Sequence, residues 1–266
     1  MNLPASAPEP PAEDPPALTV DRITLRYGGV IANSDVSFTI APGQTCGVIG
    51  PNGAGKTSLF DVVSGLRRPT SGRVLLMGED VTSHSAVRRA RAGLRRTYQR
   101  HQLFGRLTVM ENLLAAVEWR GGGGGLLADL VASPTRRKLE RRRREQAEEV
   151  LEMCSLTKLK DTYAGSLPVG LARMVELARA VVDKPRVLLL DEPTSGLDEI
   201  EAHRLAETVA KVSASHGTAV ALVEHDIGFV MERCHRIVVL NLGKVIADGT
   251  PGEIRADKEV REAYLR

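Results

Sequence analysis

The sequence predicts an α/β fold: a core with a mostly parallel sheet, a small antiparallel β subdomain and an inserted helical subdomain. Three patterns along the chain indicate this. Residues 18–27 and 35–40 alternate apolar and polar side chains, as half-buried strands do. Residues 99–182 are mostly helical in pattern, interrupted by a five-glycine tract at 121–125. From 186 to 240, apolar runs typical of buried strands alternate with helical segments, which is the order of a parallel sheet.

Each element can be placed in chain order. The two alternating segments predict an antiparallel pair; next come a buried strand at 45–49, a glycine loop, a helix at 56–64 and a strand at 72–77. The later elements are expected as strands at 186–191, 218–223 and 236–240, with helices at 199–214 and 226–232. Residues 1–17, rich in proline and alanine, are expected to form a disordered tail. The folded domain is therefore expected at 18–266, with the helical subdomain inserted at about 100–182.

Composition limits the classes of function. The chain has 266 residues, and none of its apolar runs approaches the roughly 20 residues of a membrane-spanning helix. Cys46, Cys154 and Cys234 are scattered, so neither a disulfide framework nor a zinc site is expected. A net charge of +3 is too small to indicate nucleic-acid binding. The basic run at 136–144 leaves two interpretations open: a solvated helix with acid and base pairs, or a contact with phosphate or lipid.

The glycine loop carries the strongest chemical signal. GPNGAGKT at 50–57 matches G-x-x-x-x-G-K-[ST], directly after a predicted strand and before a predicted helix. Glycines allow backbone amides to turn toward a phosphate, Lys56 can reach the β and γ phosphates, and Thr57 can ligate magnesium. This phosphate-binding loop predicts a P-loop NTPase (RecA-like) core that binds ATP and Mg²⁺. Its expected nucleotide contacts are Gly50, Pro51, Asn52, Gly53, Ala54, Gly55, Lys56, Thr57 and Ser58.

A second signal lies at the end of the strand predicted at 186–191. Its apolar run ends in Asp191 and Glu192. Ligands bind at the carboxyl edge of a parallel sheet, so both acids are expected beside the phosphates. Asp191 is expected to hold the magnesium through its water shell, and Glu192 to orient or deprotonate the attacking water.

With these motifs in order, the chain resembles the ATP-binding subunits of ABC transporters, from about residue 18 to its end. Tyr27 resembles the aromatic residue that stacks on adenine, Gln99 the glutamine of the Q-loop, and His225 the switch histidine. The sequence PTSGLD at 193–198 resembles the D-loop, whose residues are Ser195, Gly196, Leu197 and Asp198. The resemblance implies that Thr57, Gln99 and Asp191 serve the metal, that Gln99 couples the core to the helical subdomain, and that His225 senses the γ phosphate.

One motif departs from the family. The signature, usually LSGGQ, contacts the ATP bound to the opposite subunit; here the aligned residues are Leu167, Pro168, Val169, Gly170 and Leu171. Proline is acceptable at the first position of a helix, and Gly170 can still direct backbone amides at an anion, but the serine hydroxyl is lost. We therefore expect a weakened site in the opposite subunit. The alternative is that the remaining backbone contacts are sufficient to bind the nucleotide of the opposite subunit.

The regions 95–114, 222–254 and 260–265 resemble branched-chain (hydrophobic) amino acid importers of high affinity, and amide and urea importers share the pattern. This implies a motor subunit at the cytoplasmic face of the cell membrane. Its implied partners are a second ABC ATPase, which the altered signature suggests is not identical, two transmembrane permease subunits and a substrate-binding protein; no nucleic acid is expected. The alternatives are an exporter or lipid-extraction ATPase, a soluble ABC ATPase acting on nucleic acid, and a regulatory nucleotide-binding module.

Overall fold

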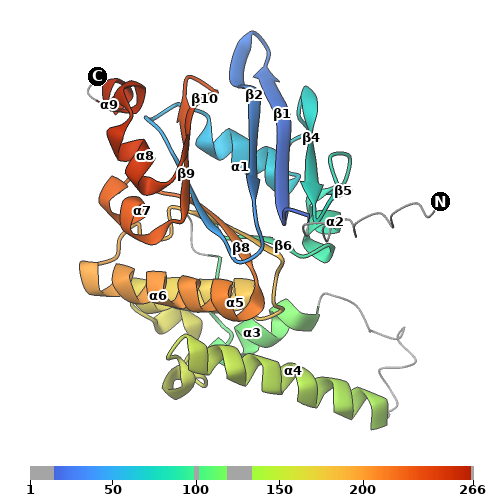
Figure 1. Cartoon of the computed structure of the whole chain (residues 1–266). Helices are drawn as coiled ribbons and strands as arrows, with labels where there is room; N and C mark the ends of the chain where they lie inside the picture. Colours follow the sequence, from blue (N-terminus) through green and yellow to red (C-terminus); the bar gives the residue numbers. More distant parts are fainter. Residues whose placement is uncertain (1–14, 99–101, 119–133, 265–266) are drawn as a thin grey trace, which may run out of the picture.

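A computed structural model describes residues 15–98, 102–118 and 134–264 (Figure 1). It contains two sheets. The six-stranded sheet has, in spatial order, β10 (Lys244–Gly249), β9 (Arg236–Asn241), β3 (Thr45–Ile49), β8 (Ala219–Val223), β7 (Val187–Asp191) and β6 (Leu94–Arg96). Its neighbouring strands are parallel, except that β10 is antiparallel to β9. The predicted α/β fold with a mostly parallel sheet is confirmed.

The smaller sheet is antiparallel. Its strands, in spatial order, are β2 (Val30–Ile40), β1 (Leu18–Tyr27), β4 (Ser71–Leu76) and β5 (Glu79–Asp80). Ala17, at the end of the predicted tail, is buried, and its carbonyl accepts a hydrogen bond from the Met77 N–H. Residues 1–14 of that tail lie outside the described part of the chain.

The core has two layers because the parallel strands are buried on both faces. Alternate residues of one strand enter different clusters: Val187 and Leu189 pack on the side of α1 (Lys56–Ser64) and the antiparallel sheet, whereas Leu188 and Leu190 pack on the side of α5 (Val169–Val181). This follows from the period of two in a strand. In Figure 1, β1, β2 and β4 lie above β8 and β6, and α3 to α6 lie below those two strands.

Helices dominate the range predicted for the helical subdomain. Here α3 (Val109–Glu118), α4 (Pro134–Met153) and α5 pack against one another. Two 3-10 turns, Thr157–Leu159 and Ala164–Ser166, connect α4 to α5. The five-glycine tract at 121–125 lies outside the described residues. The remaining helices are α2 (Ala86–Arg91), α6 (Glu199–His216), α7 (Ile227–Arg233), α8 (Pro251–Ala256) and α9 (Lys258–Tyr264). Within the described ranges, no helix combines the length and apolar character needed to cross a membrane.

The structure corrects several element boundaries. β2 begins at Val30 and not at residue 35, because its pairing with β1 contains register shifts that interrupt the alternating pattern. The strand predicted at 72–77 is β4, which ends at Leu76 because Met77 has a φ of 49° and turns the chain. The short elements β6, β10, α2, α8 and α9 were not predicted.

Candidate active site

The phosphate-binding loop lies where its motif predicts, between β3 and α1, at the carboxyl edge of the parallel sheet. Gly50 has a φ of 154° and Gly55 a φ of 100°. A Cβ at Gly50 would overlap the Leu240 carbonyl oxygen, and one at Gly55 would overlap the Ala32 carbonyl. Gly55 is the N-cap of α1, and no side chain caps this helix. The amides of its first turn therefore point outward as an anion site.

Lys56 is held inside this loop. Its Nζ donates to the carbonyl oxygens of Gly50 at 2.6 Å and Pro51 at 3.1 Å, and the residue is buried. Burial lowers the pKa of its ammonium, while the carboxylates of Glu192 and Asp191 oppose this shift. The ammonium therefore lies within the electrostatic reach of both acids, as the predicted site requires.

Asp191 ends β7 and is buried. Its Oδ2 accepts a hydrogen bond from Arg96 Nη2 at 2.9 Å, whereas its Oδ1 is buried without a partner among the described residues. A buried carboxylate oxygen without a donor costs free energy unless it meets a donor or a cation. The exposed Thr57 lies in the first turn of α1, directly after Lys56. This oxygen donor set suits magnesium, so the described residues fit the predicted metal.

Glu192 and His225 meet across the ends of two neighbouring strands, β7 and β8. Glu192 Oε1 and His225 Nε2 are 2.8 Å apart. Glu192 has a φ of 48°, a left-handed conformation, and its N–H donates to the Val223 carbonyl at 2.9 Å. Such strain at a charged residue is typical of active sites. The predicted catalytic pair is thus placed together.

The D-loop follows directly. Gly196 has a φ of 80° within a turn in which the Ser195 N–H donates to the Glu192 carbonyl and the Leu197 N–H to the Thr194 carbonyl. Asp198 is the N-cap of α6, where it forms a capping box with Glu201. The loop is therefore fixed at both ends, by the catalytic edge and by a helix.

The altered signature begins α5. We expected Pro168 at the first helical position, but it is the N-cap of α5, with a φ of −57° and a ψ of 157°. Its side chain offers no hydrogen-bond acceptor. Val169 is half-exposed. A Cβ at Gly170 would overlap the carboxylate of Glu201, the residue that caps the D-loop helix. A side chain at position 170 would therefore require the Glu201 carboxylate to move, independently of any contact with a partner's nucleotide.

Two further predicted residues are not found at this edge among the described residues. Tyr27 ends β1, is 40% exposed, and carries the guanidinium of Arg67 at 5.5 Å from its ring centroid. Gln99 lies outside the described residues. Both neighbours of the Q-loop are held by α5: Arg173 donates to the Tyr98 carbonyl at 3.1 Å, and the Gln102 N–H donates to Glu176 at 2.7 Å.

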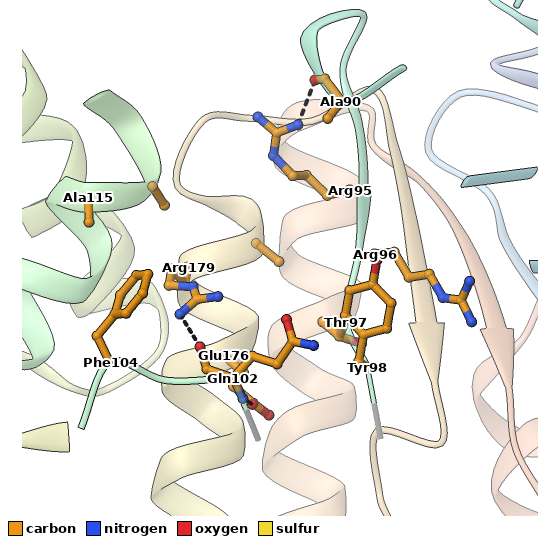
Figure 2. A pocket seen from close by; sticks show the side chains of 12 residues that line it. Ala90, Arg95, Arg96, Thr97, Tyr98, Gln102, Phe104, Ala115, Glu176 and Arg179 are labelled. Atoms are coloured by element: carbon orange, nitrogen blue, oxygen red, sulfur yellow. Dashed lines mark hydrogen bonds between the residues drawn. The ribbon is translucent and has the colours of Figure 1, made fainter. Parts of the chain in front are cut away.

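A groove of about 310 Å³ opens beside this loop (Figure 2). It lies between β6, α3 and α5, and Arg179 crosses it. The Arg179 guanidinium lies 5.2 Å from the ring centroid of Phe104 and donates to the Gln102 carbonyl at 2.6 Å. Phe104 is 53% exposed. An exposed aromatic ring beside a cation is typical of an interaction site.

Sequence reasoning missed three residues of this site. Arg96 bridges Asp191 to Asp61 of α1, at 2.9 and 2.7 Å. Glu224 is buried, and accepts from the Thr194 N–H at 2.8 Å and the His225 N–H at 3.2 Å. Tyr264 lies close enough to the Gly50 backbone for that backbone to lower the pKa of its hydroxyl, against the larger effect of burial. The sequence indicated Glu224 only through its position next to His225. It could not indicate Arg96 or Tyr264, because their partners are distant in sequence.

Comparison with known proteins gives a consistent result. The family model described as ABC transporter matches residues 33–195, and the model described as branched-chain amino acid ATP-binding cassette transporter matches residues 244–265. The chain is 40% identical over 250 residues to the high-affinity branched-chain amino acid transport ATP-binding protein BraF of Pseudomonas aeruginosa, covering 94% of this chain and 98% of that protein. The corresponding protein LivG of Escherichia coli is 37% identical with the same coverage.

Two further similarities are informative. The lipopolysaccharide export system ATP-binding protein LptB of Haemophilus influenzae is 34% identical, covering 93% of this chain and 96% of that protein. Among solved structures, the ADP conformation of an ATP-binding cassette from an ABC transporter superposes with a TM-score of 0.80 at 28% identity, over 94% of this chain and 98% of that one. The chain belongs to the ABC transporter family, as one of its ATP-binding, ATP-hydrolysing subunits.

Proposed function

We propose that this chain energises an importer for branched-chain or other hydrophobic amino acids by hydrolysing ATP at the edge formed by Lys56, Asp191, Glu192 and His225. The observation that carries the hydrolytic part is the meeting of Glu192 and His225, 2.8 Å apart, beside the phosphate-binding loop. The substrate class rests on the names of the relatives and on the carboxyl-terminal match at 244–265.

In the proposed reaction the loop amides and Lys56 bind the phosphates, and Glu192 orients and deprotonates the attacking water. His225 donates to the γ phosphate and stabilises the charge that develops on it. Thr57, Gln99 and Asp191 would hold Mg²⁺, which neutralises phosphate charge when bound. Before ATP engages, the Glu192–His225 hydrogen bond keeps both side chains at the edge where they act.

The proposed assembly is a pair of ATPase subunits beneath two permeases at the cytoplasmic face of the membrane, with a separate substrate-binding protein. ATP would lie between one chain's phosphate-binding loop and the partner's signature. The groove lined by Phe104, Arg179 and Ala115 would receive a helix of the permease, because it is open and combines an aromatic ring with a cation. The altered signature at Pro168 favours a partner subunit with a different sequence.

Phosphate release by the purified chain tests the hydrolytic part. Lys56→Ala removes the phosphate ligand and Glu192→Gln removes the base, so each is expected to lower the rate at least about a hundredfold. Glu232→Gln, an exposed glutamate on α7, is the matched control and should retain the rate. Activity retained in both site variants would contradict hydrolysis at this edge.

Transport direction and substrate require the complex. Chain, permeases and binding protein reconstituted in vesicles, with ATP on the side of the ATPase, should accumulate radiolabelled leucine, and the Glu192→Gln complex should not. The relative LptB belongs to an export system, so extraction of lipid without leucine uptake would replace the importer by an exporter.

A further inference from the structure

The amino-terminal half of α4 is a basic surface that the site above does not use. Five of its side chains point into solvent, and we name them the basic arm: Arg137, Lys138, Arg141, Arg142 and Arg144. Leu139 lies on the helix face that is buried in the carboxyl-terminal half of α4, yet its side chain is 37% exposed. In the carboxyl-terminal half, by contrast, Ala147, Val150 and Leu151 are buried in the core. The arm therefore projects from the body of the protein, as Figure 1 shows for this end of α4.

The charge order of α4 opposes helix stability. Basic residues occupy its first half, and acids at Glu145, Glu148 and Glu149 follow. The amino end of a helix carries partial positive charge, so acids stabilise it and bases destabilise it. The ion pairs Arg141–Glu145 and Arg144–Glu148 also have the base first, which is the weaker order. Local stability therefore does not account for the pattern.

Ion pairs among the described residues leave most of the arm's charge unneutralised. The Arg141–Glu145 distance is 2.9 Å and the Arg144–Glu148 distance 3.8 Å, and all four side chains are more than half exposed. Exposed ion pairs of this kind contribute little to the stability of the fold. No acid in the described part of the chain pairs with Arg137, Lys138 or Arg142. These three cations remain available to an external anion.

The arm belongs to α4, which packs against a helix that lines the groove. Ala90 of α2 and Ala115 of α3 line the groove, and α3 packs against α4. In Figure 1, α2 and the projecting end of α4 lie on the same side of the molecule. If a permease helix occupies the groove, we expect the arm, on the helix packed against α3, to lie near that permease and its membrane.

We propose that the basic arm binds the headgroups of anionic phospholipids next to the permease. This inference rests on the proposed function only in placing the arm at the membrane. Clusters of several Lys and Arg residues on one helix suit an anionic bilayer surface. Cytoplasmic permease loops are themselves enriched in Lys and Arg, so they would repel the arm. The small net charge of +3 gives no general attraction to nucleic acid.

The test is flotation of the full chain with vesicles of phosphatidylcholine alone or with 30% phosphatidylglycerol. The variant Arg137→Gln, Lys138→Gln, Arg142→Gln removes the three unpaired charges. Each basic residue near an anionic surface strengthens binding about fivefold, so this variant should bind about a hundredfold more weakly. Binding by the unaltered chain should require phosphatidylglycerol and fall with added salt.

The matched control removes three exposed charges elsewhere, as Lys211→Gln, Lys244→Gln, Arg255→Gln, and should bind like the unaltered chain. Glutamine is a good helix former, so the arm variant should keep its melting temperature. Equal loss in both variants, absence of binding by the unaltered chain at low salt, or stronger arm-dependent binding to duplex DNA would overturn the proposal. Because no permease or ATP is present, failure here leaves the phosphate-release experiment unaffected.

Discussion

At the residue scale, the two carboxylate oxygens of Asp191 differ in their hydrogen-bond partners. Oδ2 is held by Arg96, which also contacts Asp61 of α1, while Oδ1 has no partner among the described residues. The first contact fixes the rotamer of the carboxylate, and the second oxygen remains free for a cation. Arg96 therefore connects the strand that carries the predicted metal ligand to the helix that follows the phosphate-binding loop.

Pro168→Ser tests the altered signature. Serine at the N-cap of α5 supplies the acceptor that proline lacks, which should stabilise the chain by about 1 kcal/mol and restore a hydroxyl for the partner's nucleotide. We expect the ATPase rate of the assembled complex to rise several-fold, while that of the isolated chain stays constant. Pro168→Ala removes the ring without adding a hydroxyl and is the control. An unchanged rate of the complex with Pro168→Ser would favour the alternative that backbone contacts suffice.

The sequence predicts the place of a residue best where that place depends on its neighbours in the chain. Lys56 and Asp191 are identified by a loop or a strand end that surrounds them within a few positions. Arg96 could not be found in this way, since its partners are 35 and 95 positions away. Pro168 shows the remaining limit: its residue type was readable, but the helix began one residue later than expected.

At the element scale, α5 carries both the signature and the supports of the Q-loop. Arg173 and Glu176 are buried and form an ion pair, with 3.2 Å between Nη1 and Oε2. Arg173 donates to the Tyr98 carbonyl and Glu176 accepts from the Gln102 N–H, on the two sides of the Q-loop. Arg179 of the same helix faces the groove. A helix is stiff over this length, so a displacement at the groove is transmitted to the signature as motion of one body.

Glu176→Gln tests this coupling. The variant loses a buried charge-assisted pair with Arg173, which should lower the free energy of unfolding by about 2 kcal/mol in urea denaturation. We also expect the permease to stimulate the ATPase rate less, with the rate of the isolated chain changed less than twofold. Glu149→Gln breaks an exposed pair with Lys184 and should change neither property. Loss of the isolated chain's activity to the same extent would mean that Glu176 supports folding alone.

The predictability of an element depended on its length and burial. The buried strands β3, β7 and β8 were found because each is an uninterrupted apolar run. β6 has three residues, and β10 is an edge strand without a fully buried position, so neither has a clear periodic pattern. Their place is determined by pairing with β7 and β9, which is tertiary information.

At the scale of the whole molecule, the last described helix returns to the phosphate-binding loop. Tyr264 in α9 lies beside the Gly50 backbone, which acts against the effect of burial on the pKa of the Tyr264 hydroxyl. Burial raises the pKa of Tyr264 to about 12. The hydroxyl therefore stays protonated at neutral pH, and the contact should not vary with pH in that range.

Tyr264→Phe removes this hydroxyl and keeps the ring. Losing the polar interaction between this hydroxyl and the loop backbone should weaken ATP binding about fivefold, seen as a higher KM with a smaller change in kcat. Tyr163→Phe changes an exposed ring outside the site and serves as the control. If both variants keep the KM of the unaltered chain, the carboxyl-terminal helix contributes packing alone.

The close approach of Gly170 to Glu201 has an evolutionary consequence. A side chain at position 170 would displace the Glu201 carboxylate, which accepts the Asp198 N–H at 3.2 Å, and so act on the loop that precedes α6 in the same chain. A substitution at position 170 is therefore expected to have a second effect, besides any effect on the partner's nucleotide. We expect related sequences with an altered signature to vary more at positions 168, 169 and 171 than at position 170.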